Sequence, residues 1–295
     1  MSGVRPLTFA LLLLPSLALP AEGEPPAVAV TDAVNPLDAS LSADLIYERV
    51  LGNRFDASIQ EVALTSGDRA GRRELIKLQM LWRRYADLPE EEGAVLSRTL
   101  VRYLEPGDIR GAGYLVINKR SGPDDQFMYL KSMRRIRRVN LSNETVLGTD
   151  LSLEDIVPRE LEDAAVSRTQ DSAVDGQPCY VIDAVPVEGV DTQYSKFSLY
   201  VEPEHFVPLR TRYYDRAGVE IKELRARAES IRAIEGVYLP LEATMRQLQD
   251  ESFTEVRVEL LVPNPDLPKK YFTQRQLQAR RFHLPEDVMR DAQTF

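Results

Sequence analysis

The stretch Ile76-Lys-Leu-Gln-Met-Leu-Trp-Arg83 decides the fold class, because apolar side chains recur in it at every second position. A period of two is that of an extended strand with one buried face. The same period runs through most of the chain from about residue 56 onward. Further strands are predicted at residues 95–103, 113–118, 126–140, 179–187, 194–201, 207–214, 219–229, 237–246 and 253–262. Regular alternation of this kind is typical of half-buried antiparallel strands, so the sequence predicts a mainly β (α+β) protein.

Turn and helix signals interrupt the strands at a few places. Asp215-Arg-Ala-Gly218 and Glu235-Gly236 predict hairpin turns. Residues 36–52 carry a helical apolar stripe, with Ser40 or Ser42 as the cap and Gly52 as the stop.

Two later segments also depart from the period of two. Residues 148–165 predict a loop followed by a short helix that opens at Pro158. Thr273, with Gln276 three residues later, predicts the start of a helix that closes the domain.

The N-terminal 21 residues have the layout of a secretory signal peptide, with Arg5 before an apolar run over residues 7–19. That run is too short to span a bilayer, which takes about 20 apolar residues. No cysteine lies near the cleavage region, so we expect a secreted, soluble protein that is not lipidated. The predicted organisation is a signal peptide at 1–21, a flexible leader at 22–37, one domain at 38–280 and a polar tail at 281–295.

Composition excludes several functional classes. The net charge of -9 argues against nucleic-acid binding, because no global positive field attracts phosphates. Cys179 is the only cysteine, which rules out a disulfide within the chain, and His205 and His283 lie too far from it in sequence to suggest a zinc site. No Gly-rich phosphate loop or nucleophile elbow is present. We therefore expect no cofactor, no metal and no enzymatic activity, and we expect a monomer.

Six segments, in this order and spacing, carry a resemblance to a known family. They are Arg102-Tyr-Leu-Glu-Pro-Gly-Asp-Ile-Arg-Gly111; Gln126-Phe-Met-Tyr-Leu130 with Arg134-Arg-Ile-Arg-Arg-Val139; Leu147-Gly-Thr-Asp-Leu-Ser-Leu-Glu-Asp-Ile156; Val174-Asp-Gly-Gln-Pro-Cys-Tyr-Val181; Pro208-Leu-Arg210 with Tyr213-Tyr-Asp215; and Tyr271-Phe-Thr273. Over roughly residues 40–280 the chain resembles the outer membrane lipoprotein-sorting protein family, relatives of the LolA and LolB periplasmic carriers.

The resemblance implies a strongly curved antiparallel sheet, an incomplete barrel of about eleven strands with helices packed in its mouth and an apolar cavity between. It also implies a periplasmic carrier or receptor that binds a lipid or an acylated lipoprotein, and it offers an RND-type membrane transporter as a partner. The alternative is a non-transporting accessory subunit that docks on such a transporter or envelope complex and keeps the cavity filled with its own side chains.

Three groups of residues are candidates for the site. The predicted cavity face consists of Ile76, Leu78, Met80, Trp82, Val101, Tyr103, Tyr114 and Val116. If the protein is a carrier, these side chains bind acyl chains. The alternative interpretation is that they only pack against the two predicted helices.

The other two groups are polar. Arg134, Arg135, Arg137 and Arg138 predict a rim that grips phosphate head groups or an acidic partner. Asp150, Glu154 and Asp155 belong to the predicted loop. Internal pairing of the arginines with Glu154 and Asp155 is the alternative to a binding rim.

Overall fold

The computed structural model describes residues 37–85, 95–140, 145–146, 148–156, 161–279 and 284–295. The predicted signal peptide and all of the predicted leader except Leu37 lie outside these ranges. Within them, no helix is long and apolar enough to cross a membrane.

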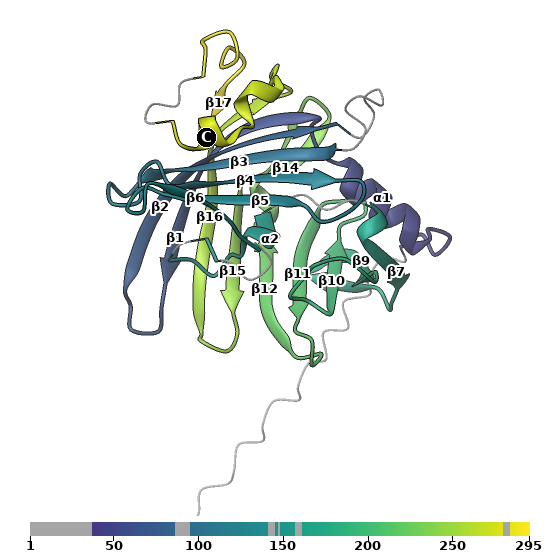
Figure 1. Cartoon of the computed structure of the whole chain (residues 1–295). Coiled ribbons are helices and arrows are strands. Elements are labelled where there is room, and N and C mark those ends of the chain that lie inside the picture. Colours follow the sequence, from purple (N-terminus) through teal and green to yellow (C-terminus); the bar gives the residue numbers. More distant parts are fainter. Residues whose placement is uncertain (1–36, 86–94, 141–144, 147, 157–160, 280–283) are drawn as a thin grey trace, which may run out of the picture. The chain divides into compact units, whose positions relative to one another are not determined.

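The first half of the chain forms six strands that pair in sequence order (Figure 1). Their bounds are β1 Ala57–Gly67, β2 Arg73–Arg84, β3 Val95–Glu105, β4 Gly113–Lys119, β5 Asp125–Leu130 and β6 Arg135–Arg138.

The second half contributes the remaining strands. They are β7 Ala164–Arg168, β8 Ser172–Val174, β9 Gln177–Pro186, β10 Lys196–Val201, β11 Pro208–Tyr214, β12 Glu220–Ala226, β13 Ile231–Ile234, β14 Val237–Pro240, β15 Glu242–Gln247, β16 Ser252–Pro263 and β17 Gln293–Thr294.

In the described part of the chain, one 15-stranded sheet has the main order β6-β5-β4-β3-β2-β1-β16-β15-β12-β11-β10-β9-β7. Its neighbouring strands pair antiparallel, as the alternation predicted, and β1 joins the two halves by pairing with both β2 and β16. The order has two ends, β6 and β7, and the hairpin β13–β14 stands apart from the sheet. The sheet is thus larger than the eleven strands expected, and the predicted curvature of an incomplete barrel stays a prediction.

Two predicted strands are each divided in the structure. Residues 126–140 form the hairpin β5–β6, and Arg134 in its turn has a φ of 48°. Residues 237–246 form β14 and β15, which pair with different partners. Pro240 ends β14, and proline cannot donate a ladder hydrogen bond. The hairpin turns predicted at Gly218 and at Glu235-Gly236 are confirmed.

The helices are short, and two of the three have the predicted caps. Helix α1 spans Ala43–Gly52, and the Ser42 hydroxyl accepts from the Leu45 amide at 3.2 Å. Helix α3 spans Gln274–Leu277, and the Thr273 hydroxyl accepts from the Gln276 amide. Helix α1 begins later than the predicted residue 36, because Ser42 and not an earlier residue supplies its cap.

Helix α2, Leu153–Ile156, lies in the part of the segment that the sequence predicted as a loop, and it is not the helix predicted at Pro158. It comes before Pro158, which lies outside the described residues. In the described part of the chain, single 3-10 turns also occur at Leu161–Asp163, Ala228–Ser230 and Lys269–Tyr271.

Buried apolar residues form separate clusters on the two faces of the sheet. The larger cluster, called the main cluster here, draws on β1 to β5, on β9 to β11, on β15 and on α1. A second cluster on the opposite face joins Ile59, Leu81, Leu100 and Leu115 to Leu267, Tyr271, Phe272 and Leu277. Figure 1 shows this C-terminal segment, in yellow, beside β3. Both faces of the first strands are therefore covered, whereas the alternation of apolar and polar residues predicted only one buried face.

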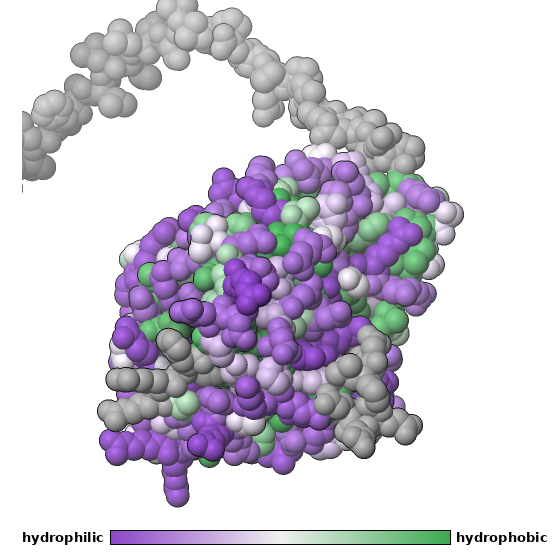
Figure 2. Space-filling model, turned by 90° about the horizontal axis from the view of Figure 1, so that it is seen from above, coloured by the Kyte–Doolittle hydropathy of each residue, from purple (hydrophilic) through white to green (hydrophobic). Residues whose placement is uncertain are grey.

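One face of the surface is mostly polar. Figure 2 shows hydrophilic side chains over most of the face seen from above, with hydrophobic ones scattered among them. Scattered apolar side chains of this kind are ordinary for a protein surface and need no explanation. The apolar face that the sequence predicted must therefore be sought inside the molecule.

Candidate functional site

The predicted cavity face is buried and packed. Ile76, Leu78, Val101, Tyr103, Tyr114 and Val116 belong to the main cluster, and Met80 packs against it. Trp82 is buried outside that cluster, with the guanidinium of Arg54 5.5 Å from its ring centre. Seven of the eight side chains therefore share one buried apolar face, and their contact with an acyl chain stays a prediction.

Part of the cover of this face is the segment 148–156, called the inner loop here. Its Leu151 side chain is only 3% exposed, and Ile156 packs against the main cluster. Just before it, Val146 is buried as well, and its amide donates to the Leu151 carbonyl at 2.8 Å. The inner loop therefore places its own apolar side chains where the sequence predicted a cavity.

Asp150 fastens one end of the inner loop to β16. Its carboxylate accepts from the Thr254 hydroxyl at 2.9 Å and from the Ser252 hydroxyl, and its amide donates to the Thr254 hydroxyl. Thr254 is completely buried, so its hydroxyl lies away from water, while Asp150 and Ser252 are partly exposed. A carboxylate that accepts several hydrogen bonds is a strong anchor, because charge-assisted bonds are stronger than neutral ones.

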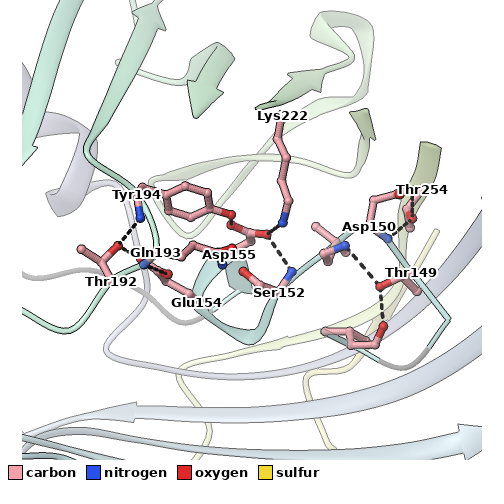
Figure 3. Close-up of polar contacts among 12 residues, drawn as sticks. Thr149, Asp150, Ser152, Glu154, Asp155, Thr192, Gln193, Tyr194, Lys222 and Thr254 are labelled. Carbon is pink, nitrogen blue, oxygen red and sulfur yellow. Dashed lines mark hydrogen bonds and ion pairs between the residues drawn. The ribbon is translucent and has the colours of Figure 1, made fainter. Parts of the chain in front are cut away.

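Asp155 fastens the other end to β12 through a buried ion pair (Figure 3). Its carboxylate lies 3.1 Å from the ammonium of Lys222, and the two side chains are 0% and 6% exposed. The Tyr194 hydroxyl donates to the same carboxylate at 2.7 Å, and the Ser152 amide donates at 2.7 Å. Removing one partner of such a buried pair costs about 3–5 kcal/mol, because the other charge is left without compensation.

The residues beside this pair complete its polar surroundings. Glu154 accepts from the hydroxyl of Thr192 and from the amide of Gln193. Burial first, and then the Asp155 carboxylate, raises the pKa of Tyr194 above its usual range. The phenol therefore keeps its proton and remains a donor to Asp155.

A small pocket of about 170 Å³ adjoins the ion pair. It is lined by Tyr47, Leu51, Glu154, Asp155, Ala184, Phe197, Leu199, Thr211 and Tyr213. Ligand pockets typically hold about 300–1,000 Å³, so this space is too small for a whole acyl chain while the inner loop is in place. Glu154 and Asp155 are the predicted residues that line it.

Sequence reasoning missed the aromatic wall of this pocket. The rings of Tyr194, Phe197 and Tyr213 meet with centroids 5.0–5.6 Å apart, in tilted and edge-to-face arrangements. The signal was present as aromatic residues in two neighbouring predicted strands, 194–201 and 207–214. It was missed because the pairing register that brings Phe197 opposite Tyr213 is not readable from one sequence.

The four arginines lie elsewhere, at the edge of the sheet. Arg135, Arg137 and Arg138 are exposed on β6, and Arg134 is exposed in the turn before it. Arg138 pairs with Asp125 at 2.6 Å, while Asp155 pairs with Lys222. The predicted pairing of the arginines with Glu154 and Asp155 is therefore wrong. Arg135 and Arg137 point to the face of β6 opposite Ile136, whose side chain packs against the second cluster.

The remaining candidates for chemistry are structural. Cys179 is buried, and that burial raises the pKa of its thiol from 9.0 to about 12. A thiol of this kind is a poor nucleophile at neutral pH, because the thiolate is the reactive form. Within the described ranges, no group of His, Cys, Asp or Glu side chains could hold a metal ion.

Comparisons with solved structures place this fold in a class. A domain from Vibrio parahaemolyticus, whose name provisionally assigns it to outer membrane lipoprotein sorting, has a TM-score of 0.70 at 20% identity over 80% of this chain and 98% of that one. A LolA superfamily protein from Nitrosomonas europaea has a TM-score of 0.65 at 21% identity, over 80% of this chain and 100% of that one. The chain has the LolA-superfamily fold, as the six segments predicted.

The family follows from the sequence models. A model described as an uncharacterized protein matches residues 96–279, more than half of the chain, and the chain belongs to that family. The model of DUF1329, a family of unknown function, matches residues 39–145. A DUF1329 family protein from Desulfovibrio piger has a TM-score of 0.71 at 22% identity, over 80% of this chain and 98% of that one. No curated protein matches the chain. Neither family model describes a catalytic activity.

Proposed function

We propose that this protein is a periplasmic carrier or receptor that binds the acyl chain of a lipid or lipoprotein on the face of its sheet now covered by the inner loop. The observation that carries the proposal is the inner loop itself. Leu151 and Ile156 occupy the main cluster, yet polar anchors hold the loop there. When the loop leaves, it vacates an apolar space that continues into the 170 Å³ pocket.

The proposal takes the sheet to be bent around that space as an incomplete barrel. One continuous cluster supports this view, because it includes residues of β5 near one end of the sheet and of β9 near the other. In a flat sheet these strands would lie about 48 Å apart at the usual spacing of about 4.8 Å. A bend brings them to one core, with α1 at its mouth.

The energetics are sufficient for a carrier. Burial of an acyl chain gains about 0.8 kcal/mol per methylene, so a chain of ordinary length supplies on the order of 10 kcal/mol. Departure of the inner loop costs roughly 3–5 kcal/mol for the ion pair and about 1.5–3 kcal/mol for each of Leu151 and Ile156, so the gain and the cost are of similar size. A ligand can thus displace the inner loop, although the covered state is stable without it.

The arginines of β6 and its turn form the proposed rim, which contacts the head groups of the membrane that supplies the ligand. Lys131 extends the basic run, and Met133 is 44% exposed beside it. Guanidinium groups bind phosphate oxygens in a forked geometry, so this hairpin suits anionic head groups at a membrane surface. The proposal also includes secretion through the predicted signal peptide, action as a monomer and an RND-type transporter as partner.

The test is uptake of a fluorescent fatty acid by delipidated full-length protein. Saturable binding of about one chain per molecule is expected, together with faster proteolysis within the inner loop when ligand is present. Absence of saturable binding would overturn the carrier, whatever the proteolysis pattern.

A second candidate is the accessory subunit, which docks on a membrane transporter and transports nothing. The packed state of the predicted cavity face favours it specifically, since the pocket that remains is small. Co-purification of a transporter with protein that shows no saturable fatty-acid uptake would support this candidate against the carrier.

A further inference from the structure

Lys222 is a cation buried on the apolar face of the sheet. Among the described residues, Arg102 and Lys222 are the two buried basic residues. Arg102 belongs to the opposite face, where its guanidinium donates to the backbone carbonyls of Gln276 and Ala279 at 2.6 and 2.7 Å. Lys222 instead depends on a carboxylate that belongs to the inner loop.

The inner loop presents a carboxylate and apolar groups side by side. Asp155 meets Lys222 and the Tyr194 hydroxyl, while Ile156, the next residue, packs against the main cluster. Leu151 is buried in the same cluster four residues earlier. In chemical terms this is the pattern of an acidic amphiphile, with an anionic head beside an apolar body.

Departure of the inner loop would leave Lys222 without its counter-ion. A buried charge must be paired or hydrogen-bonded, since a bare ion in a low-dielectric interior is strongly disfavoured. A neutral ligand could fill the apolar space but would leave the ammonium uncompensated. An anionic ligand would restore the pair and would also accept from the Tyr194 hydroxyl.

We propose that the ligand is a single-chain amphiphile with an anionic head group, whose carboxylate or phosphate replaces Asp155 on Lys222 and Tyr194. This inference rests on the proposed carrier function and names the class of its ligand. The exchange makes and breaks no covalent bond. The ligand anion takes the position of the Asp155 carboxylate, and the inner loop moves into solvent, where water solvates the freed carboxylate.

The experiment compares four ligands of equal chain length on the delipidated full-length protein. Palmitic acid, palmitoyl lysophosphatidic acid, methyl palmitate and hexadecanol each compete with the neutral probe N-phenyl-1-naphthylamine. The two anions are expected to bind on the order of a hundredfold more tightly than the two neutral compounds, since only they compensate the buried charge. The affinities of palmitic acid and palmitoyl lysophosphatidic acid are then compared, to show whether the site prefers a carboxylate or a phosphate head group.

Variants assign the preference to Lys222. In the double variant Lys222→Gln with Asp155→Asn, acid and ester are expected to bind within about threefold of each other, because the charge to be compensated is gone. The matched control is Lys196→Gln with Asp183→Asn, which removes another Lys–Asp pair, at 2.9 Å, on more exposed side chains. That control should keep the full preference for the acid.

The outcomes separate the two proposals. Equal affinity of acid and ester for the wild-type protein overturns the anionic ligand but leaves the carrier, and this comparison needs no variant to fold. Loss of the preference in the Lys196 control, or its survival in the Lys222 variant, overturns the role of Lys222. Failure of every acyl compound to displace the probe overturns the carrier itself.

Discussion

The two faces of the sheet are both covered, but their covers are attached differently. On the face with the main cluster, the inner loop is held by carboxylates that meet a lysine and hydroxyl groups of the strands. On the opposite face, the C-terminal segment is held by packed Leu267, Phe272 and Leu277 and by an arginine that binds backbone carbonyls. The first set of contacts can be exchanged for a ligand's anion, whereas the second cannot. In the proposed carrier, the inner loop is therefore the cover that moves.

Lys222→Ala should produce the largest loss of stability. The substitution leaves Asp155 buried without its counter-ion, so the free energy of unfolding should fall by about 3–5 kcal/mol. Urea unfolding followed by circular dichroism measures this change. The double variant Lys222→Met with Asp155→Asn should recover much of the loss, because both charges are gone and the amide oxygen can still accept from Tyr194 and Ser152. A loss below about 1 kcal/mol for Lys222→Ala would mean that the inner loop is not held by this pair.

Arg102→Ala tests the attachment of the opposite cover. It leaves the carbonyls of Gln276 and Ala279 without their charged donor, and a loss of about 2–3 kcal/mol is expected in the same urea experiment. Arg110→Ala is the matched control, because its guanidinium also donates to a carbonyl but is exposed. Fatty-acid uptake by Arg102→Ala should equal that of the wild type. Reduced uptake would indicate that the ligand binds on the face of the sheet covered by the C-terminal segment, and would contradict the proposed site.

Thr254→Val should have a smaller effect on the inner loop. It removes the hydroxyl that bonds Asp150, while Ser252 still donates to that carboxylate. The expected loss is about 1–2 kcal/mol, accompanied by faster hydrogen exchange in the inner loop. Thr254→Ser keeps the hydroxyl and should leave the exchange rates of the inner loop near those of the wild type. Unchanged exchange in Thr254→Val would show that Asp150 does not restrain the loop.

Removal of two rim arginines should affect stability least. Arg135 and Arg137 are exposed, so Arg135→Ala with Arg137→Ala should change the free energy of unfolding by less than about 0.5 kcal/mol. Binding to phosphatidylglycerol vesicles should weaken by roughly 25-fold, since each basic residue near an anionic surface contributes about fivefold. Vesicle sedimentation measures this, with Arg232→Ala and Arg257→Ala as surface controls. Undiminished sedimentation of the Arg135 and Arg137 variant would remove the rim from the proposal.

The sequence was informative wherever local chemistry governs structure. The alternation around Ile76 predicted strands and one apolar face, and Ser42 and Thr273 cap helices as their types favour. It could not indicate that Asp155 meets Lys222, because these residues are 67 positions apart and the contact depends on the whole sheet order. The same limit explains the mistaken partner for the arginines, since the β5–β6 pairing that brings Asp125 to Arg138 depends on a turn that the sequence did not predict.

The open ends of the sheet have a consequence for behaviour at high concentration. At one end, α1 lies against β7, and Arg168 of β7 donates to the carbonyls of Asp38 and Leu41 just before the helix. At the other end, β6 presents arginines, which would repel an identical strand from a second molecule. Neither end can therefore readily recruit a copy of itself, because one edge is covered by a helix and the other is positively charged, and the sheet is protected against growth into fibres.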